Sequence, residues 1–171
     1  YQIDRNINYT NFCTEYCSFC AFYRPLGHEE GYVHTHETIF EKIRETMALG
    51  GTGILMQGGL HPDLKIEWYE DLLREIKKRF DIWCHCFSAP EIVNIAEVSG
   101  LSIEDTLKRL RDAGLDSLPG GGALAEARLT LDQLDGLAHG TQRGLTNHSG
   151  WAGEGEHRAV VVSIQFQAEE D

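Results

Sequence analysis

The sequence predicts an α/β protein built on a parallel sheet. Short apolar runs alternate with longer segments in which apolar residues recur at helical spacing, and this alternation continues for about four strand-helix units. Most of the helical segments are followed by a glycine or lead directly into the next apolar run. Such repeated units form either an open doubly wound sheet or part of a (β/α) barrel.

Each element has a local signal. Ile39, Phe40 and Ile43 share one face of a predicted helix, and Gly50 ends it. The expected strands cover residues 3–9, 53–57, 82–87 and 115–118. The expected helices cover 35–49, 66–80 and two segments within 91–113 that are divided at 99–100.

The composition changes after residue 122. The last 49 residues contain no Pro, Cys or Lys, whereas the first 122 hold all of them. We expect a helix at 124–137 and a strand at 159–166, with loop or disorder over 136–157. The predicted domains are therefore a core at 1–122 and an atypical tail at 123–171, either frame-shifted or poorly ordered.

Charge and hydropathy limit the partners. A formal net charge of -12 and a pI near 5.0 disfavour nucleic acid, because no basic surface is available to neutralise phosphates. No apolar run approaches the ~18 residues of a membrane span, and the first residues lack the features of a signal peptide. We therefore expect a cytoplasmic protein that binds a small molecule and contacts neither membrane nor nucleic acid.

Five cysteines lie between Cys13 and Cys86, and this odd, clustered set favours metal ligation over a disulfide framework. Cys13, Cys17 and Cys20 form a C-x3-C-x2-C pattern. Three thiolates in one loop can hold a 4Fe-4S cluster and leave one iron open to chelate S-adenosylmethionine. The alternatives are a zinc site completed by a residue such as His28, or buried structural thiols.

Parallel sheets bind ligands at the carboxyl ends of their strands, so the loops there are the candidate sites. Gly58 and Gly59 follow the second strand and would allow close approach of a ligand, or form an ordinary loop. Ser88 and Glu91 follow the third strand and fit either a ligand contact or a helix capping box.

A second cysteine pair lies on the third predicted strand. Cys84 and Cys86 share one strand face, with a histidine between them on the other. We interpret them as a packed pair of small residues instead of a metal site.

The motifs INYTNFCTEYCSFCAFYR, EGYV, LMQGGLHPDL and SLPGGG closely resemble those of the cyclic dehypoxanthine futalosine synthases, radical SAM enzymes of menaquinone biosynthesis. The resemblance covers about residues 1–122. It implies a partial TIM-like (β/α) barrel of the radical SAM type, truncated after about four βα units. It also implies a 4Fe-4S cluster, S-adenosylmethionine and an electron donor such as flavodoxin or ferredoxin.

The resemblance assigns roles to residues in three loops. The cluster ligands would be Cys13, Cys17 and Cys20. The contacts to S-adenosylmethionine would come from the adenine-binding Phe19, from the backbone carbonyls of Gly58 and Gly59, and from Ser88, which would bind the methionine carboxylate or the ribose.

Three further residues are candidates for the substrate site. Tyr23 and Arg24 resemble an aromatic-basic pair, and Arg24 could meet the benzoate carboxylate, although a surface arginine is the ordinary interpretation. Glu91 is a candidate for holding substrate or cofactor and for a catalytic role.

The implied reaction is a radical cyclisation of dehypoxanthine futalosine, started by a 5'-deoxyadenosyl radical that takes a ribose hydrogen. The base that completes it is not indicated by the sequence. The alternatives are aminofutalosine synthase, the radical SAM synthase of the deazaflavin precursor, and a non-catalytic fragment that binds iron-sulfur or zinc.

Overall fold

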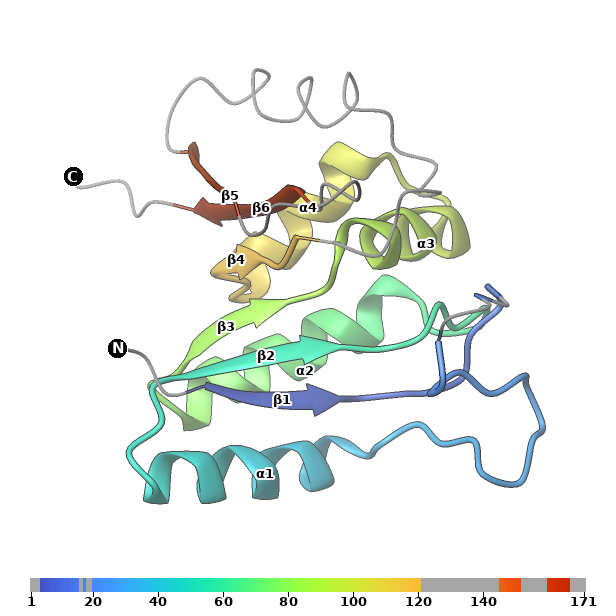
Figure 1. Cartoon of the computed structure of the whole chain (residues 1–171), viewed down its shortest axis with the longest axis horizontal. Helices are drawn as coiled ribbons and strands as arrows, with labels where there is room; N and C mark the ends of the chain where they lie inside the picture. The colour runs from blue at the N-terminus through green and yellow to red at the C-terminus, as the bar shows by residue number, and fades with distance from the viewer. Residues whose placement is uncertain (1–3, 16, 18–19, 121–144, 152–159, 167–171) are drawn as a thin grey trace.

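The computed structural model describes residues 4–15, 17, 20–120, 145–151 and 160–166 (Figure 1). These residues form one six-stranded sheet with the order β1-β2-β3-β4-β6-β5. The strands are β1 Asp4–Asn8, β2 Gly53–Gln57, β3 Trp83–Cys86, β4 Ser117–Leu118, β5 Leu145–Trp151 and β6 Val160–Phe166. The helices are α1 His36–Ala48, α2 Ile66–Arg79, α3 Ala89–Ser99 and α4 Ile103–Ala113.

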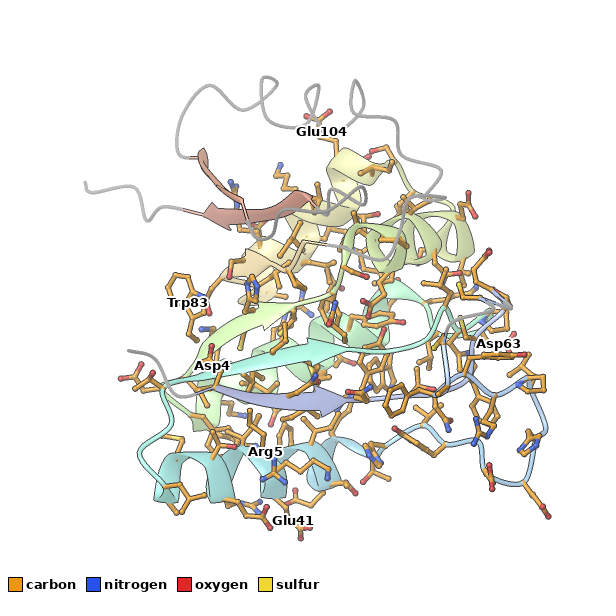
Figure 2. All side chains as sticks on the ribbon, in the orientation of Figure 1. Asp4, Arg5, Glu41, Asp63, Trp83 and Glu104 are labelled. Atoms are coloured by element: carbon orange, nitrogen blue, oxygen red, sulfur yellow. The ribbon has the colours of Figure 1, made fainter. Side chains whose placement is uncertain are left out.

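The first four strands are parallel, which confirms the predicted α/β sheet. Ile7 pairs with Met56, and Met56 pairs with Cys86, so the carboxyl ends of β1, β2 and β3 lie at one edge. Figure 1 shows these three strands pointing the same way, toward the long loop between β1 and α1. In Figure 2, Asp4 and Trp83 lie at the opposite end of the sheet from Asp63.

The helix boundaries follow from their caps. Thr35 accepts a hydrogen bond from the Thr38 amide at the start of α1, and Ser102 accepts one from the Asp105 amide at the start of α4. The predicted division between the last two helices is confirmed, because Gly100 has a φ of 68° and ends α3. None of the helices in the described ranges has the length and apolar character needed to cross a membrane.

The fourth strand is shorter than predicted. It was expected to begin at Leu115, but the Leu115 amide donates to the carbonyl of Leu110 at 3.0 Å. Gly114, with a φ of 117°, turns the chain at the end of α4. Leu115 therefore completes the helix end, and the ladder begins two residues later at Ser117.

The expectation of loop or disorder over residues 136–157 is wrong for Leu145–Trp151, which forms β5. This segment pairs antiparallel with β6 along its whole length, from Leu145 opposite Phe166 to Trp151 opposite Val160. Its polar sequence has no apolar alternation, so the pairing partner decides its conformation. The strand expected at 159–166 is confirmed as β6, while the helix expected at 124–137 lies outside the described residues.

The core lies between the sheet and the helices. It contains the buried side chains of the parallel strands, such as Ile7, Ile54 and Cys84, together with apolar residues from all four helices. Tyr9, just beyond β1, is fully buried and its ring contacts three aromatic rings, those of Trp68, Tyr69 and Phe87. This aromatic group supports the carboxyl ends of β1 and β3.

An ion pair between a buried glutamate and a partly exposed arginine joins α2 to α4. Arg109 Nε donates to Glu70 Oε1 at 2.8 Å and Arg109 Nη2 donates to Oε2 at 2.7 Å, while Glu70 is only 5% exposed. These hydrogen bonds lower the pKa of the Glu70 carboxyl below its ordinary value. The ion pair therefore stabilises the fold above the pKa that Glu70 has in the unfolded state. This stabilisation is lost as the pH falls through the lower pKa that Glu70 has in the folded state.

We expect Glu70→Gln to reduce the free energy of unfolding by about 1–3 kcal/mol at neutral pH, because it removes a charge-assisted, bidentate interaction. The reduction should shrink as the pH falls from the ordinary glutamate pKa, about 4.3, through the lower folded-state pKa, below which the wild-type carboxyl is itself protonated. Urea unfolding across this pH range measures both effects. Glu75→Gln, which alters an exposed pair within α2, is the control and should have a smaller effect. An equal loss at acidic and neutral pH would contradict this account.

Candidate functional site

The cysteine loop is fixed to the end of β1 by backbone hydrogen bonds. Phe12 and Arg24 form a parallel bridge in which Cys13 N donates to Arg24 O at 3.1 Å and Arg24 N donates to Asn11 O at 2.7 Å. A second bridge pairs Thr10 with Val33. The loop is therefore closed at its base, and its three cysteines lie beyond the carboxyl end of the sheet.

The loop after β2 contacts the cysteine loop directly. Gly59 N donates to Thr10 O at 3.0 Å, and Leu60 N donates to Cys13 Sγ at 3.3 Å. Leu60 O in turn accepts from Thr14 N at 3.1 Å. The segment 58–60 is thus bonded to the chain on both sides of Phe12.

Glycine is required in this segment by close packing. A Cβ added to Gly59 would lie 2.2 Å from the carbonyl oxygen of Phe12 and 2.9 Å from Cys13 Cβ. A Cβ on Gly58 would lie 2.6 Å from the Tyr9 ring. Real Cβ atoms do not approach other atoms so closely, so only glycine allows the two loops to meet as they do.

The three loop cysteines fit the predicted iron-sulfur cluster in their chemistry. None of the three forms a disulfide and all three are half-buried, and Cys13 Sγ already accepts N–H bonds from Leu60 and from Glu15, the latter at 3.4 Å. Backbone N–H groups directed at cysteine sulfur are typical of iron-sulfur sites. No three His, Cys, Asp or Glu side chains in the described ranges are grouped to hold one metal ion, so this ligand set stays a prediction.

The capping box, one of the two interpretations of Ser88 and Glu91, is present at the start of α3. Ser88 is the N-cap, and Glu91 Oε2 accepts from Ser88 N at 2.8 Å and from Ser88 Oγ at 2.6 Å. The other carboxyl oxygen reaches outside the helix, because Oε1 accepts from Tyr9 OH at 2.8 Å and from Gly58 N at 2.9 Å. Glu91 therefore joins residues that follow three different strands.

Glu91 is 2% exposed, and no described cation is paired with it. Burial raises the pKa of its carboxyl above the ordinary value, while the hydrogen bonds that it accepts act in the opposite direction.

The backbone between β3 and α3 is strained at Phe87. This residue has a φ of 61°, in the left-handed region that residues other than glycine rarely adopt. Phe87 N donates to Met56 O at 2.9 Å, which holds this turn against β2.

Tyr23, Arg24 and Cys20 line the same surface pocket. The pocket has a volume of about 380 Å³ and is lined by Cys20, Ala21, Tyr23, Arg24, Pro25, His28 and Glu30. Within it, Arg24 is paired with Glu30 through bonds of 2.6 and 2.7 Å, and Arg24 Nη1 donates to Tyr23 O at 2.9 Å. The structure thus brings both predicted substrate residues beside a predicted cluster ligand, whereas Phe19 lies outside the described residues.

Two residues of this site were not predicted from the sequence. Tyr9 was assigned only to a strand, although an aromatic hydroxyl at a strand end is a sign of a buried hydrogen-bond partner. Leu60 acts through its backbone amide and carbonyl, for which the side chain provides no signal. The packed pair Cys84 and Cys86 is confirmed, since both are fully buried in the core.

Comparison with known proteins identifies the chain's relatives. The model of the Radical SAM superfamily matches residues 7–122. The chain is 58% identical over 138 residues to the cyclic dehypoxanthine futalosine synthase of Halalkalibacterium halodurans, an alignment that covers 78% of this chain and 37% of the relative. It is 44% identical over 125 residues to the Streptomyces coelicolor protein of the same name, covering 72% and 31%.

A protein of another name is also similar. The 5-amino-6-(D-ribitylamino)uracil–L-tyrosine 4-hydroxyphenyl transferase of Methanopyrus kandleri is 42% identical over 124 residues, covering 72% of this chain and 34% of the relative. The chain therefore spans about a third of the length of these relatives. Its four parallel strands and their helices form a partial TIM-like barrel. The chain belongs to the radical SAM superfamily, whose members use a 4Fe-4S cluster and S-adenosylmethionine.

Proposed function

We propose that this chain carries the cofactor-binding part of a cyclic dehypoxanthine futalosine synthase, which converts dehypoxanthine futalosine to its cyclic form in menaquinone biosynthesis. The observation that carries the proposal is the junction of the cysteine loop with the segment 58–60, in a chain that is 58% identical to a synthase of this name. Within the described ranges, this junction brings Cys13, the first cysteine of the loop, against the glycine turn that follows β2.

In this proposal Cys13, Cys17 and Cys20 hold the cluster. A 4Fe-4S cluster bound there supplies one-electron reduction, the chemistry by which S-adenosylmethionine is cleaved. The chain's own contribution is to fix the thiol loop against the segment 58–60, and to exclude water with the aromatic group around Tyr9.

Ser88 is proposed to contact the ribose of S-adenosylmethionine. Its hydroxyl donates to Glu91 Oε2 at 2.6 Å and its oxygen accepts the backbone amide of Glu91 in the capping box, so one lone pair remains available to a ligand. A ribose hydroxyl can donate to Ser88, whereas a methionine carboxylate would need the proton that Glu91 accepts. This geometry favours the ribose over the carboxylate.

The pocket beside Cys20 is proposed to take the substrate. Arg24 is the group suited to a benzoate carboxylate, and its present partner Glu30 is an exposed carboxylate that a substrate carboxylate would replace. We further infer a cytoplasmic location. We also infer an electron donor such as flavodoxin or ferredoxin, because the cluster must be reduced before it can cleave S-adenosylmethionine.

The first prediction concerns the reaction. With dehypoxanthine futalosine, S-adenosylmethionine and dithionite under anaerobic conditions, a protein that contains this chain together with the rest of the barrel should give 5'-deoxyadenosine and the cyclic product, both measured by mass spectrometry. Formation of 5'-deoxyadenosine without cyclic product would contradict the assigned substrate. Because several relatives are transferases acting on 5-amino-6-(D-ribitylamino)uracil and tyrosine by name, a parallel assay with those two compounds tests the second candidate function.

The second prediction concerns the cluster ligands. Cys17→Ala and Cys20→Ala should each abolish the visible absorbance of the anaerobically reconstituted protein and most of its bound iron, because three ligands are the minimum set proposed. Cys84→Ala is the matched control, since that thiol is free but buried in the core. It should lower stability and leave the iron content per folded chain unchanged. A colourless wild-type protein that contains zinc would favour the structural metal site instead.

The third prediction concerns the glycine turn. Gly59→Ala places a methyl group against the Phe12 carbonyl, and it should displace the cysteine loop and reduce the iron bound per folded chain. Gly50→Ala is the control, because its added Cβ meets nothing within 4 Å although its φ of 81° strains the chain. It should cost about 1 kcal/mol of stability with iron content unchanged. Equal iron content in both variants would show that the close contact is unimportant for the cluster.

A further inference from the structure

Three consecutive peptide groups after β2 are oriented by three different acceptors. Gly58 N donates to Glu91 Oε1 at 2.9 Å, Gly59 N donates to Thr10 O at 3.0 Å, and Leu60 N donates to Cys13 Sγ at 3.3 Å. All peptide bonds of the described chain are trans, so the N–H and C=O of each group point in opposite directions. The carbonyls of Gly58 and Gly59 therefore point away from Thr10 and Cys13.

Those two carbonyls are available to a ligand. Within the described ranges, no side chain and no loop amide donates a hydrogen bond to the carbonyl oxygen of Gly58 or of Gly59. Two carbonyl oxygens without donors, in a turn that has no side chains, form an acceptor site for a primary ammonium group. The amino group of S-adenosylmethionine has this chemistry.

Glu91 holds the first of the three peptide groups. Its two oxygens accept four hydrogen bonds, one backbone N–H and one hydroxyl at each oxygen, so the carboxylate is fully used by the chain itself. It is 2% exposed and has no remaining site for a substrate or cofactor atom. A group arranged in this way acts through its neighbours and not on a ligand.

We propose that Glu91 is a positioning residue, whose carboxylate fixes the peptide group before Gly58 so that the Gly58 and Gly59 carbonyls are presented to the amino group of S-adenosylmethionine. This inference rests on the proposed function for the identity of the ligand. It replaces the expectation that Glu91 itself holds substrate or cofactor.

The test compares Glu91→Gln with two other variants. The glutamine has nearly the same size, but its NH2 group must face either the Gly58 amide or the Ser88 amide, so one backbone N–H loses its acceptor. Glu70→Gln changes another buried glutamate, which is 5% exposed and is bonded to Arg109 between α2 and α4. Tyr9→Phe removes one donor to Glu91 but leaves the Gly58 bond and the packed ring in place.

Two measurements are made on the full chain. The first is the affinity of the reconstituted protein for S-adenosylmethionine, obtained from the change that the ligand causes in the electron paramagnetic resonance spectrum of the reduced cluster. The second is hydrogen exchange at the Gly58 and Ser88 amides of the chain without cluster. We expect Glu91→Gln to weaken binding on the order of tenfold at unchanged iron content, and to speed exchange at one of these amides. Tyr9→Phe should have a smaller effect on both.

Glu70→Gln should leave the affinity and both amides as in the wild type. The positioning role is overturned if Glu91→Gln binds as tightly as the wild type, or if Glu70→Gln weakens binding equally. A wild-type protein whose cluster does not respond to S-adenosylmethionine overturns the proposed ligand instead. Hydrogen exchange at Gly58 and Ser88 then still decides whether Glu91 fixes this turn.

Discussion

The arrangement of the site depends on one buried carboxylate. Glu91 lies where the chain leaves β1, β2 and β3, and it accepts hydrogen bonds from Tyr9, Gly58 and Ser88, one residue from each of these places. The parallel ladder aligns the strands but ends with them, so the loops beyond need other bonds to keep their relative positions. Glu91 provides such bonds, and the segment 58–60 extends them to the cysteine loop.

A carboxylate in the core carries a cost, since burial penalises its charged form. The four donors and the N-terminus of α3 offset this cost, and the left-handed Phe87 adds local strain at the same place. Glu70, by contrast, is buried against Arg109 and joins α2 to α4. The two glutamates differ in their chemistry: Arg109 neutralises the charge of Glu70, whereas backbone amides and hydroxyls surround the carboxylate of Glu91.

Much of the fold was predictable because its signals are local. The spacing of Ile39, Phe40 and Ile43, the caps at Thr35 and Ser102, and the glycine at 100 each mark an element with nearby residues. The capping box of Ser88 and Glu91 was predictable for the same reason. Glu91 also accepts hydrogen bonds from Tyr9, which is 82 positions away in the sequence, and from Gly58, which is 33 positions away. Contacts over such separations leave no local pattern in the sequence. The strand β5 was not predicted for the same reason, because its conformation comes from pairing with β6 and not from a local pattern.

These observations divide the proposed site into two kinds of residue. The cysteines are the proposed ligands, and among the described residues their loop is attached to the sheet through the bridges at its base and through the segment 58–60. The glycines have no side chain, and this allows the Phe12 carbonyl and the Tyr9 ring to approach them closely. Neither the cysteines nor the glycines can fix their own positions. The position of both follows from backbone amides whose acceptors belong to other strands, so residues outside the recognisable motifs decide whether the motifs meet.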